Sequence, residues 1–156
     1  MAEFVRNKLG EDVVVANFLE VEPGEIFDTA FDLVSLRHVL EHLPDCLLAM
    51  RKLHALLVPG GHVLIEIPNV ESISKKFKRF LSDSGLRKSR YPKDLVIGHA
   101  NEFCRESFDF LLSETGFELV RWETYSKKPL SNFLYNYVHV GSSARALIRA
   151  ATAATH

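Results

Sequence analysis

Two histidines and a glutamate lie close together in the sequence, at His38, Glu41 and His42, in the pattern His-x-x-Glu-His. Imidazole and carboxylate groups are common zinc ligands, and on an α-helix residues four positions apart share one face. The pattern matches an inverted zinc-protease motif, with Glu114 or Glu118 as a distant third ligand. The alternatives are that His42 caps or packs at a helix start, or that it lines an active site without metal.

Other side chains that could do chemistry lie further along the chain. His99, in the stretch GHANEF, suits a general base because imidazole titrates near neutral pH, although a surface position is the simpler interpretation. Asn69 follows an apolar run and could either line a substrate pocket or form a turn. Asp32 stands at the entry of its predicted strand, where a structural role is favoured.

An alternation of strands and helices must position these groups. Short apolar and β-branched runs predict strands over residues 12–18, 31–36, 62–67 and 117–125. Helices are predicted over 2–9, over 107–115 and along the amphipathic stripe of Leu43, Leu47, Met50, Leu53 and Leu57. A tight reversal is predicted at Pro59-Gly60-Gly61, a short closing strand is a candidate at 137–140, and the alanine-rich tail from Ser142 is predicted to be helical.

This alternation of strands and helices indicates an α/β fold with a mainly parallel sheet and helices on both faces. In such sheets ligands bind beyond the carboxyl ends of the strands. The rule selects three clusters, one after each of the first three predicted strands: Asn17-Phe18, Ser35-Leu36-Arg37 and Pro68-Asn69.

The stretches FDLVSLRHVLEHLPD, PGGHVLIEIPN, GHANEF and ETGFELV occur in an order and spacing that resembles the later motifs of class I S-adenosylmethionine-dependent methyltransferases. The resemblance covers residues 3–125 and implies a Rossmann-like fold, in which the predicted strands are the third to sixth of a seven-stranded sheet. The preceding strand, Pro44 directly after the histidine motif and the PGG turn fit this family better than a zinc protease. We therefore expect no metal at His38 and His42.

The resemblance implies S-adenosylmethionine as the cofactor. Asn17, where the family usually has aspartate, and Phe18 would hold the adenine, since the Asn17 amide oxygen can accept a hydrogen bond from the adenine amino group. The methionine part would lie against Ser35, Leu36 and Arg37. The candidate catalytic residues are His42 and His99, and the candidate substrate-binding residues are Asn69 and His99.

The family's glycine-rich loop and its ribose-binding acidic residue are not found in this sequence, which begins in what resembles the helix after them. We expect an N-terminally incomplete methyltransferase domain over residues 1–141, with a basic cap over 72–105, and an alanine-rich tail over 142–156. Each missing polar contact costs about 1 kcal/mol, so this chain alone is expected to bind the cofactor weakly or not at all.

The composition is that of a soluble globular protein, with 47% hydrophobic and 25% charged residues and a net charge of −1. A net charge this close to zero produces no overall electrostatic field that would attract nucleic acid. No apolar run is long enough to span a bilayer. The charge is uneven, because residues 1–71 carry 12 acidic and 5 basic side chains, whereas residues 72–93 carry 8 basic and 1 acidic. This basic segment is either a solvated helix face or a contact for an anionic surface through Lys75, Lys76, Lys78 and Arg79.

The two cysteines, Cys46 and Cys104, match no metal or redox spacing, and the N-terminus lacks the apolar core of a signal peptide. Both features favour a cytoplasmic location. The predicted function is methyl transfer from S-adenosylmethionine to a small-molecule, lipid-like or sugar-like acceptor. A non-catalytic methyltransferase-like remnant or interaction module is the alternative, and a zinc metalloprotease is a distant third.

Overall fold

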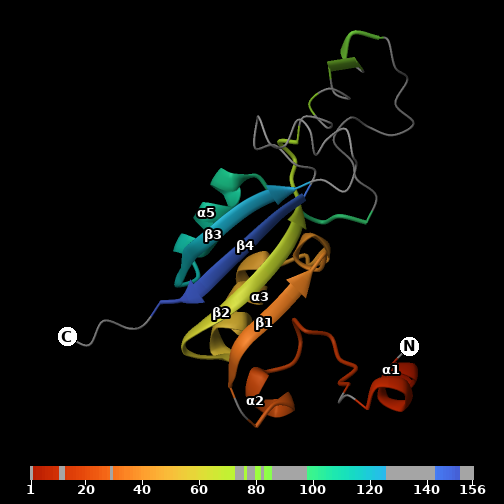
Figure 1. The fold of residues 1–156 in the computed structure, drawn as a ribbon, viewed down its shortest axis with the longest axis vertical. Coiled ribbons are helices and arrows are strands. Elements are labelled where there is room, and N and C mark those ends of the chain that lie inside the picture. The colour runs from red at the N-terminus through yellow and green to blue at the C-terminus, as the bar shows by residue number, and fades with distance from the viewer. Residues whose placement is uncertain are drawn as a thin grey trace, which may run out of the picture.

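The computed structural model describes residues 2–10, 13–28, 30–72, 76, 80–81, 83–85, 98–125 and 143–151. Its described strands form one sheet in the order β1-β2-β4-β3 (Figure 1). The strands are Phe31–Arg37 (β1), Leu57–Pro68 (β2), Phe117–Tyr125 (β3) and Ser143–Ala150 (β4). The α/β class predicted from the sequence is confirmed, and three of the four predicted strands correspond to β1, β2 and β3.

The strand directions bring several strand ends to one edge of the sheet. β1 and β2 are parallel, whereas β4 is antiparallel to both of its neighbours, β2 and β3. The described sheet is therefore mixed. Its upper edge in Figure 1 gathers the carboxyl ends of β1, β2 and β3 with the amino end of β4. This is the edge at which α/β sheets bind ligands.

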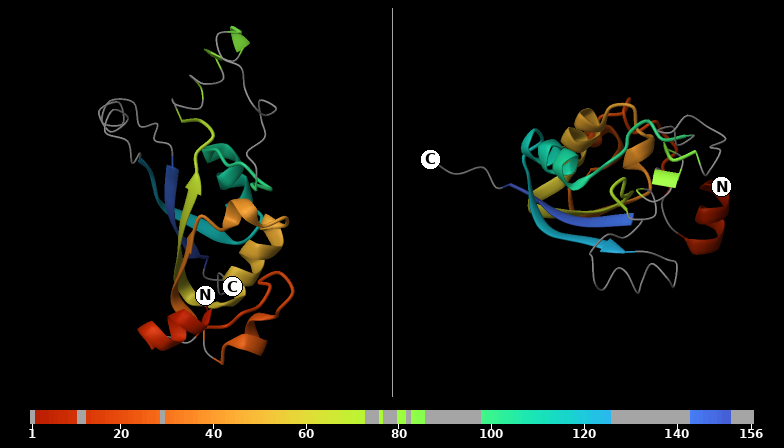
Figure 2. Two further views of the ribbon diagram at one scale, coloured as in Figure 1. Left: turned by 90° about the vertical axis from the view of Figure 1, so that its right-hand side faces the viewer. Right: turned by 90° about the horizontal axis from the view of Figure 1, so that it is seen from above.

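The hydrophobic core lies between the sheet and two helices, α3 (Cys46–Ala55) and α5 (Arg105–Ser113), which pack on the same face (Figure 2). Because side chains alternate along a strand, Val63, Ile65 and Ile67 of β2 all point into this core and are completely buried. Met50 of α3 and Phe108 of α5 meet them there with no exposed surface. Burying a side chain of this size contributes about 1.5–3 kcal/mol, so this layer holds the site's scaffold rigid.

The prediction of a strand over residues 12–18 is wrong for residues 13–18, because these residues form no strand. Val14 and Val15 are 51% and 76% exposed. A β-branched run needs a neighbouring strand to pair with, and no described strand lies beside this one. The predicted first helix is confirmed as α1 (Ala2–Leu9), and a short helix, α2 (Pro23–Ile26), lies in the following loop.

A buried lysine fixes the loop between α1 and α2. Lys52 of α3 is 6% exposed, and its Nζ donates to the Val21 carbonyl oxygen at 2.6 Å and to Glu22 Oε1 at 2.9 Å. Phe18 and Leu19 of the same loop pack against the core. The loop that holds the predicted adenine site is therefore attached to α3.

The alanine-rich tail was predicted to be helical, and this prediction is wrong for residues 143–150. Residues Ser143–Ala150 form β4, which lies between β2 and β3. Alanine favours helices, but here Ala144, Ala146 and Ile148 alternate with polar or larger residues and are buried in the core. The period of two and the cross-strand pairing outweigh the intrinsic helix preference. The candidate strand at 137–140 lies outside the described residues.

Pro59, Gly60 and Gly61, predicted as a tight reversal, belong to the first part of β2. The register with β1 shifts there, between the Phe31–Leu57 pair and the next pairs, so the three residues form an irregular segment of the strand. Gly60 has a φ of 78°, in the left-handed region. The predicted helix over 107–115 is confirmed as α5, shifted by two residues. No helix in the described ranges has the length and apolarity needed to cross a membrane.

Candidate functional site

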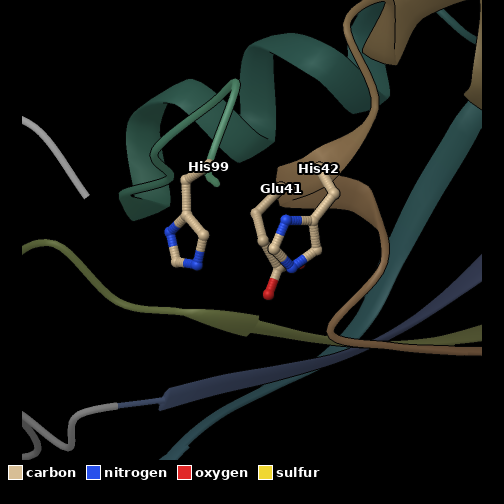
Figure 3. A group of neighbouring side chains, drawn as sticks. All are labelled: Glu41, His42 and His99. Carbon is tan, nitrogen blue, oxygen red and sulfur yellow. The ribbon is translucent and has the colours of Figure 1, made fainter. Parts of the chain in front are cut away.

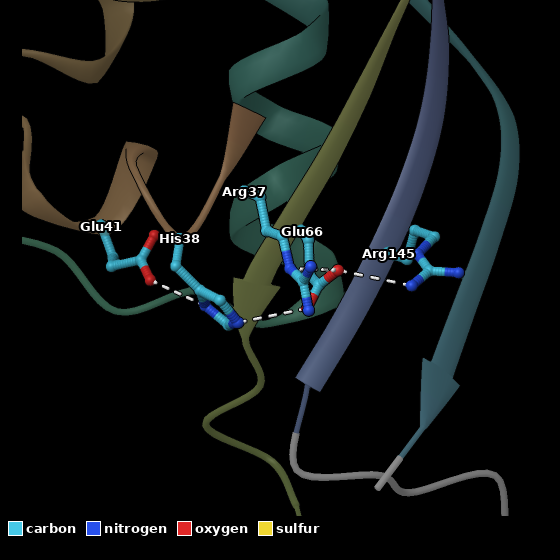
Figure 4. Close-up of polar contacts among 5 residues, drawn as sticks. All are labelled: Arg37, His38, Glu41, Glu66 and Arg145. Carbon is cyan, nitrogen blue, oxygen red and sulfur yellow. Dashed lines mark hydrogen bonds and ion pairs between the residues drawn. The ribbon is translucent and has the colours of Figure 1, made fainter. Parts of the chain in front are cut away.

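A sharp turn at His38 begins the site. β1 ends at Arg37, and His38 has a φ of 52°, a left-handed conformation that costs an ordinary residue about 1–2 kcal/mol. Its amide donates to the Glu66 carbonyl oxygen at 2.9 Å, which extends the pairing of β1 with β2. The imidazole consequently lies between two carboxylates, with Nδ1 3.2 Å from Glu41 Oε1 and Nε2 3.2 Å from Glu66 Oε1 (Figure 4).

Glu66 is a buried carboxylate of β2 and the centre of an ion-pair network. Its Oε2 lies 3.4 Å from Arg37 Nε and accepts a hydrogen bond from Arg145 Nη2 at 3.3 Å (Figure 4). The strand register explains this, because Glu66 is paired with Arg37 on β1 and with Arg145 on β4. Burial would raise the pKa of Glu66, but the nearby Tyr125 hydroxyl, Arg145, Arg37 and His38 outweigh burial and lower the pKa.

Glu41 is the second buried carboxylate, at 1% exposure, and lies in the 3₁₀ helix η1 (Leu40–His42). Its Oε1 faces His38, but its Oε2 is buried without a hydrogen-bond partner among the described residues. A buried carboxylate oxygen without a partner is costly, and native proteins rarely leave one without a reason. This oxygen is therefore available to a ligand.

The segment 98–101 is held against η1 and the next residue, Leu43, by four hydrogen bonds. The Glu41 carbonyl oxygen accepts from the amides of Ala100 and Asn101, at 2.8 and 3.0 Å. Asn101 Nδ2 donates to the Leu43 carbonyl oxygen at 2.6 Å, and His42 Nδ1 lies 2.5 Å from the Gly98 carbonyl oxygen. Residues almost sixty positions apart are thereby fixed side by side.

This anchoring brings His99 to His42 and Glu41 (Figure 3). The two imidazole rings meet edge to face with centroids 5.0 Å apart. One ligand atom from each of Glu41, His42 and His99 lies within 4.8 Å of the other two. His42 is exposed and His99 half-buried, so the cluster, which we call the Glu-His-His cluster, is open to solvent on one side.

A sequence profile of the methyltransferase domain family matches residues 5–121, well over half of the chain. The chain belongs to this family. The family expected from the sequence motifs is therefore confirmed.

Solved methyltransferases share the fold at low sequence identity. A SAM-dependent methyltransferase from Archaeoglobus fulgidus gives a TM-score of 0.64 at 16% identity, over 94% of this chain and 70% of that chain. Mitomycin 7-O-methyltransferase MmcR gives 0.61 at 17%, over 96% and 38%. N-methyltransferase NodS from Bradyrhizobium japonicum, solved with S-adenosyl-L-homocysteine, gives 0.55 at 15%, over 94% and 59%. This chain thus spans 38–70% of their lengths; no curated protein sequence matches it.

In this methyltransferase domain the residues predicted for the methionine part of the cofactor lie at the end of β1. Arg37 has 65% of its side chain exposed, and Ser35 is exposed on the same face. The Leu36 side chain is buried in the core, so any ligand contact from Leu36 is made by its backbone. The role of these residues stays a prediction.

The residues predicted for the adenine end lie in the loop tied to Lys52. The Asn17 side chain stabilises a turn, because Oδ1 accepts from the Leu19 amide at 3.2 Å and Nδ2 donates to Glu20 Oε1 at 2.7 Å. Phe18 is half-buried against the core. Asn17 is exposed, and its amide oxygen has a second lone pair for a ligand.

The remaining predicted residues lie in three different places. His42 and His99, predicted independently as catalytic candidates, lie together in the Glu-His-His cluster. Asn69 is 6% exposed, accepts from the Glu71 amide at 3.0 Å and pairs with Phe103 as a β-bridge, which supports the turn interpretation. In the basic segment the described Lys76 lies 3.8 Å from Glu71, whereas Lys75, Lys78 and Arg79 lie outside the described residues.

The geometry of the zinc-protease motif is not formed. His38 precedes η1 and sits in a left-handed turn, so His38 and His42 are not one helical turn apart on a shared face. Both ring nitrogens of His38 face carboxylates already. Of the two candidate third ligands, Glu118 pairs with Arg149 at 2.5 Å on the sheet, and Glu114 is an exposed residue that caps the end of α5.

Sequence reasoning missed the central role of Glu66 and the contribution of Arg145. A signal for Glu66 was present, because a carboxylate inside the apolar run HVLIEI is predicted to be buried and must then find cations. Arg145 could not be found, because the tail was expected to be helical and separate from the sheet. A pocket on the face opposite the helices was also not foreseen; it is lined by Leu64, Arg121, Glu123, Arg145 and Leu147.

Proposed function

We propose that this domain transfers the methyl group of S-adenosylmethionine to a small-molecule, lipid-like or sugar-like acceptor. The observation that carries the proposal is the match of residues 5–121 to the methyltransferase domain family. The relative NodS was solved with S-adenosyl-L-homocysteine, the product that this cofactor leaves behind, which supports the choice of cofactor.

The residues at the sheet edge have the chemistry to hold this cofactor. The exposed Arg37 guanidinium suits the carboxylate of the methionine part, and the Asn17 amide oxygen suits the adenine amino group. When bound, S-adenosylmethionine supplies a methyl group on a positively charged sulfur. The buried carboxylate of Glu41, whose Oε2 has no hydrogen-bond partner among the described residues, gives this edge negative charge that favours a cationic ligand.

His42 and His99 would bind the acceptor or take its proton. An acceptor hydroxyl or amine would form its new bond to the methyl carbon as the carbon–sulfur bond breaks, with the sulfur keeping that electron pair, and the acceptor would lose a proton. The Gly98 carbonyl oxygen can only accept a hydrogen bond, so His42 Nδ1 is the protonated nitrogen and Nε2 of the neutral ring carries a free lone pair. Nε2 can therefore accept that proton or hold the acceptor in place.

The compartment and the acceptor class remain part of the proposal. Cys46 and Cys104 are both free thiols, which fits the reducing cytoplasm that we propose. Lys76 of the basic segment fits contact with an anionic acceptor or surface.

Saturation-transfer NMR with S-adenosylmethionine tests the proposal, because it detects binding even when affinity is weak. We expect signal transfer to the adenine and methionine protons. Arg37→Met should weaken the affinity by roughly tenfold or more, since a charge-assisted contact is worth about 1.5–3 kcal/mol and each 1.4 kcal/mol is tenfold. Arg51→Met, an exposed arginine on α3, is the matched control and should behave as the wild type. Absence of transfer at millimolar cofactor would favour the non-catalytic interaction module instead.

A further inference from the structure

The Glu-His-His cluster contains two groups that lack partners. Glu41 Oε2 and His99 Nδ1 are buried atoms without a hydrogen-bond partner among the described residues. Glu41 is itself 1% exposed, so the oxygen cannot be satisfied by moving into bulk water. The unpartnered Glu41 oxygen lies beside the rings of His42 and His99 (Figure 3), so one ligand bound between the three side chains would satisfy it.

We propose that Glu41, His42 and His99 bind a divalent transition-metal ion, with Zn²⁺ as the representative ion. The three ligand atoms lie within 4.8 Å of one another, close enough for one ion to reach all three after small side-chain rotations. Two imidazoles and one carboxylate form a ligand set that zinc uses with a fourth position open to water or substrate. Magnesium and calcium, which prefer oxygen ligands, fit this set poorly.

The surroundings of the cluster support its ligands in the way that metal sites require. His42 Nδ1 donates to the Gly98 carbonyl oxygen, which fixes the ring and leaves Nε2 for the ion. Glu41 Oε1 is held by His38 Nδ1 at 3.2 Å, so its other oxygen is directed elsewhere. The backbone bonds from Ala100 and Asn101 to the Glu41 carbonyl oxygen hold the neighbouring His99 segment in place.

This site differs from the zinc-protease motif found in the sequence, in which His38 and His42 were the two imidazole ligands. Here His99 takes the place of His38. It also goes beyond methyl transfer, since metal binding requires no cofactor. When an ion is bound, His42 and His99 are its ligands, and the ion would lower the pKa of an acceptor hydroxyl at its open position in place of a histidine base.

The test is isothermal titration of ZnCl₂ into the full chain, purified without a histidine tag and stripped with EDTA. We expect one ion per chain and binding at least about tenfold weaker in His42→Gln and in His99→Gln, because even loss of a supporting group costs 10–100-fold. His62→Gln, in the first half of β2 and outside the cluster, is the matched control and should bind like the wild type. Co²⁺ absorption in the visible range should report the same change in each variant.

Three results would overturn the proposal: no saturable Zn²⁺ uptake by the wild type, unchanged uptake by both cluster variants, or tighter binding of Mg²⁺ than of Zn²⁺. His42 is exposed, so His42→Gln should fold even if a change at buried Glu41 does not, and circular dichroism checks this. Because the titration uses the metal alone, its outcome is independent of whether S-adenosylmethionine binds.

Discussion

Glu66 of β2 lies directly opposite Arg145 of β4 in the sheet register, and its Oε2 accepts a hydrogen bond from Arg145 Nη2 at 3.3 Å. Arg37 approaches the same oxygen from β1. One carboxylate therefore connects the parallel and the antiparallel parts of the sheet at the edge where the ligand is expected.

Glu66→Gln should lower the free energy of unfolding by about 1.5–3 kcal/mol at pH 7, because it removes a charged hydrogen-bond acceptor from buried partners. The pKa of Glu66 is lowered in the folded state, so its contribution is present above the unfolded pKa and is lost as pH falls through the folded pKa. Urea unfolding at several pH values measures this, and the difference between variant and wild type should shrink in acid. Glu114→Gln, at an exposed position, should show no such trend.

Cys46 should react slowly with alkylating reagents. Burial, together with the negative charges of Asp45 and Glu41, raises the pKa of its thiol to about 11. At pH 8 the thiolate fraction is then roughly two orders of magnitude below that of an unfolded cysteine, and thiolate is the reactive form. Mass spectrometry after iodoacetamide treatment of native and urea-unfolded protein measures the ratio. Equal rates at Cys46 in the two states would contradict the burial seen here.

Lys52→Met should release the loop that carries Asn17 and Phe18. The substitution keeps the packing of the side-chain stem but removes the bonds from Nζ to the Val21 carbonyl oxygen and to Glu22. We expect a loss of about 1–3 kcal/mol in unfolding free energy, and faster hydrogen exchange at residues 19–21. Arg51→Met, one residue away on the exposed side of α3, is the control. Equal effects of the two substitutions would show that the tether is unimportant.

Gly61→Ala should be clearly destabilising, whereas Gly24→Ala should be close to neutral. A Cβ at Gly61 would lie 2.9 Å from the Val58 carbonyl oxygen and 3.1 Å from that of Phe31, and neither backbone atom can move easily. A Cβ at Gly24 meets nothing within 4 Å. Overpacking of this kind typically costs 1–3 kcal/mol, which thermal unfolding of the two variants would detect. A similar melting temperature for both variants would mean that the start of β2 relaxes freely.

Local sequence patterns predicted the helices and strands whose apolar side chains form the core. The apolar runs of β1, β2 and β3 and the stripe of α3 were recognisable because each has one periodicity and one buried face. Residues 13–18 have the same β-branched composition but lack a paired neighbour, and composition alone does not reveal pairing. The sequence of β4 is rich in alanine, and only its place between two strands decides its conformation.

The candidate site was predictable as separate residues but not as an arrangement. His42 and His99 were each identified by residue type and position. Their meeting depends on the bonds from the 98–101 segment to η1, which are backbone contacts between distant parts of the chain. The contacts of the His38 ring with both Glu41 and Glu66 likewise start from a left-handed turn at His38, a conformation for which a histidine gives no strong sequence signal.

The position of β4 has a consequence for how the chain acquires its fold during synthesis. β4 is the last described strand in the sequence, yet it lies between β2 and β3 and pairs with both. When β3 leaves the ribosome, no described strand is yet available to receive it at the edge of β2, so the two remain separate until Ser143–Ala150 emerges. The sheet therefore closes late and through contacts that are distant in sequence, which slows folding and prolongs the exposure of unpaired strand edges.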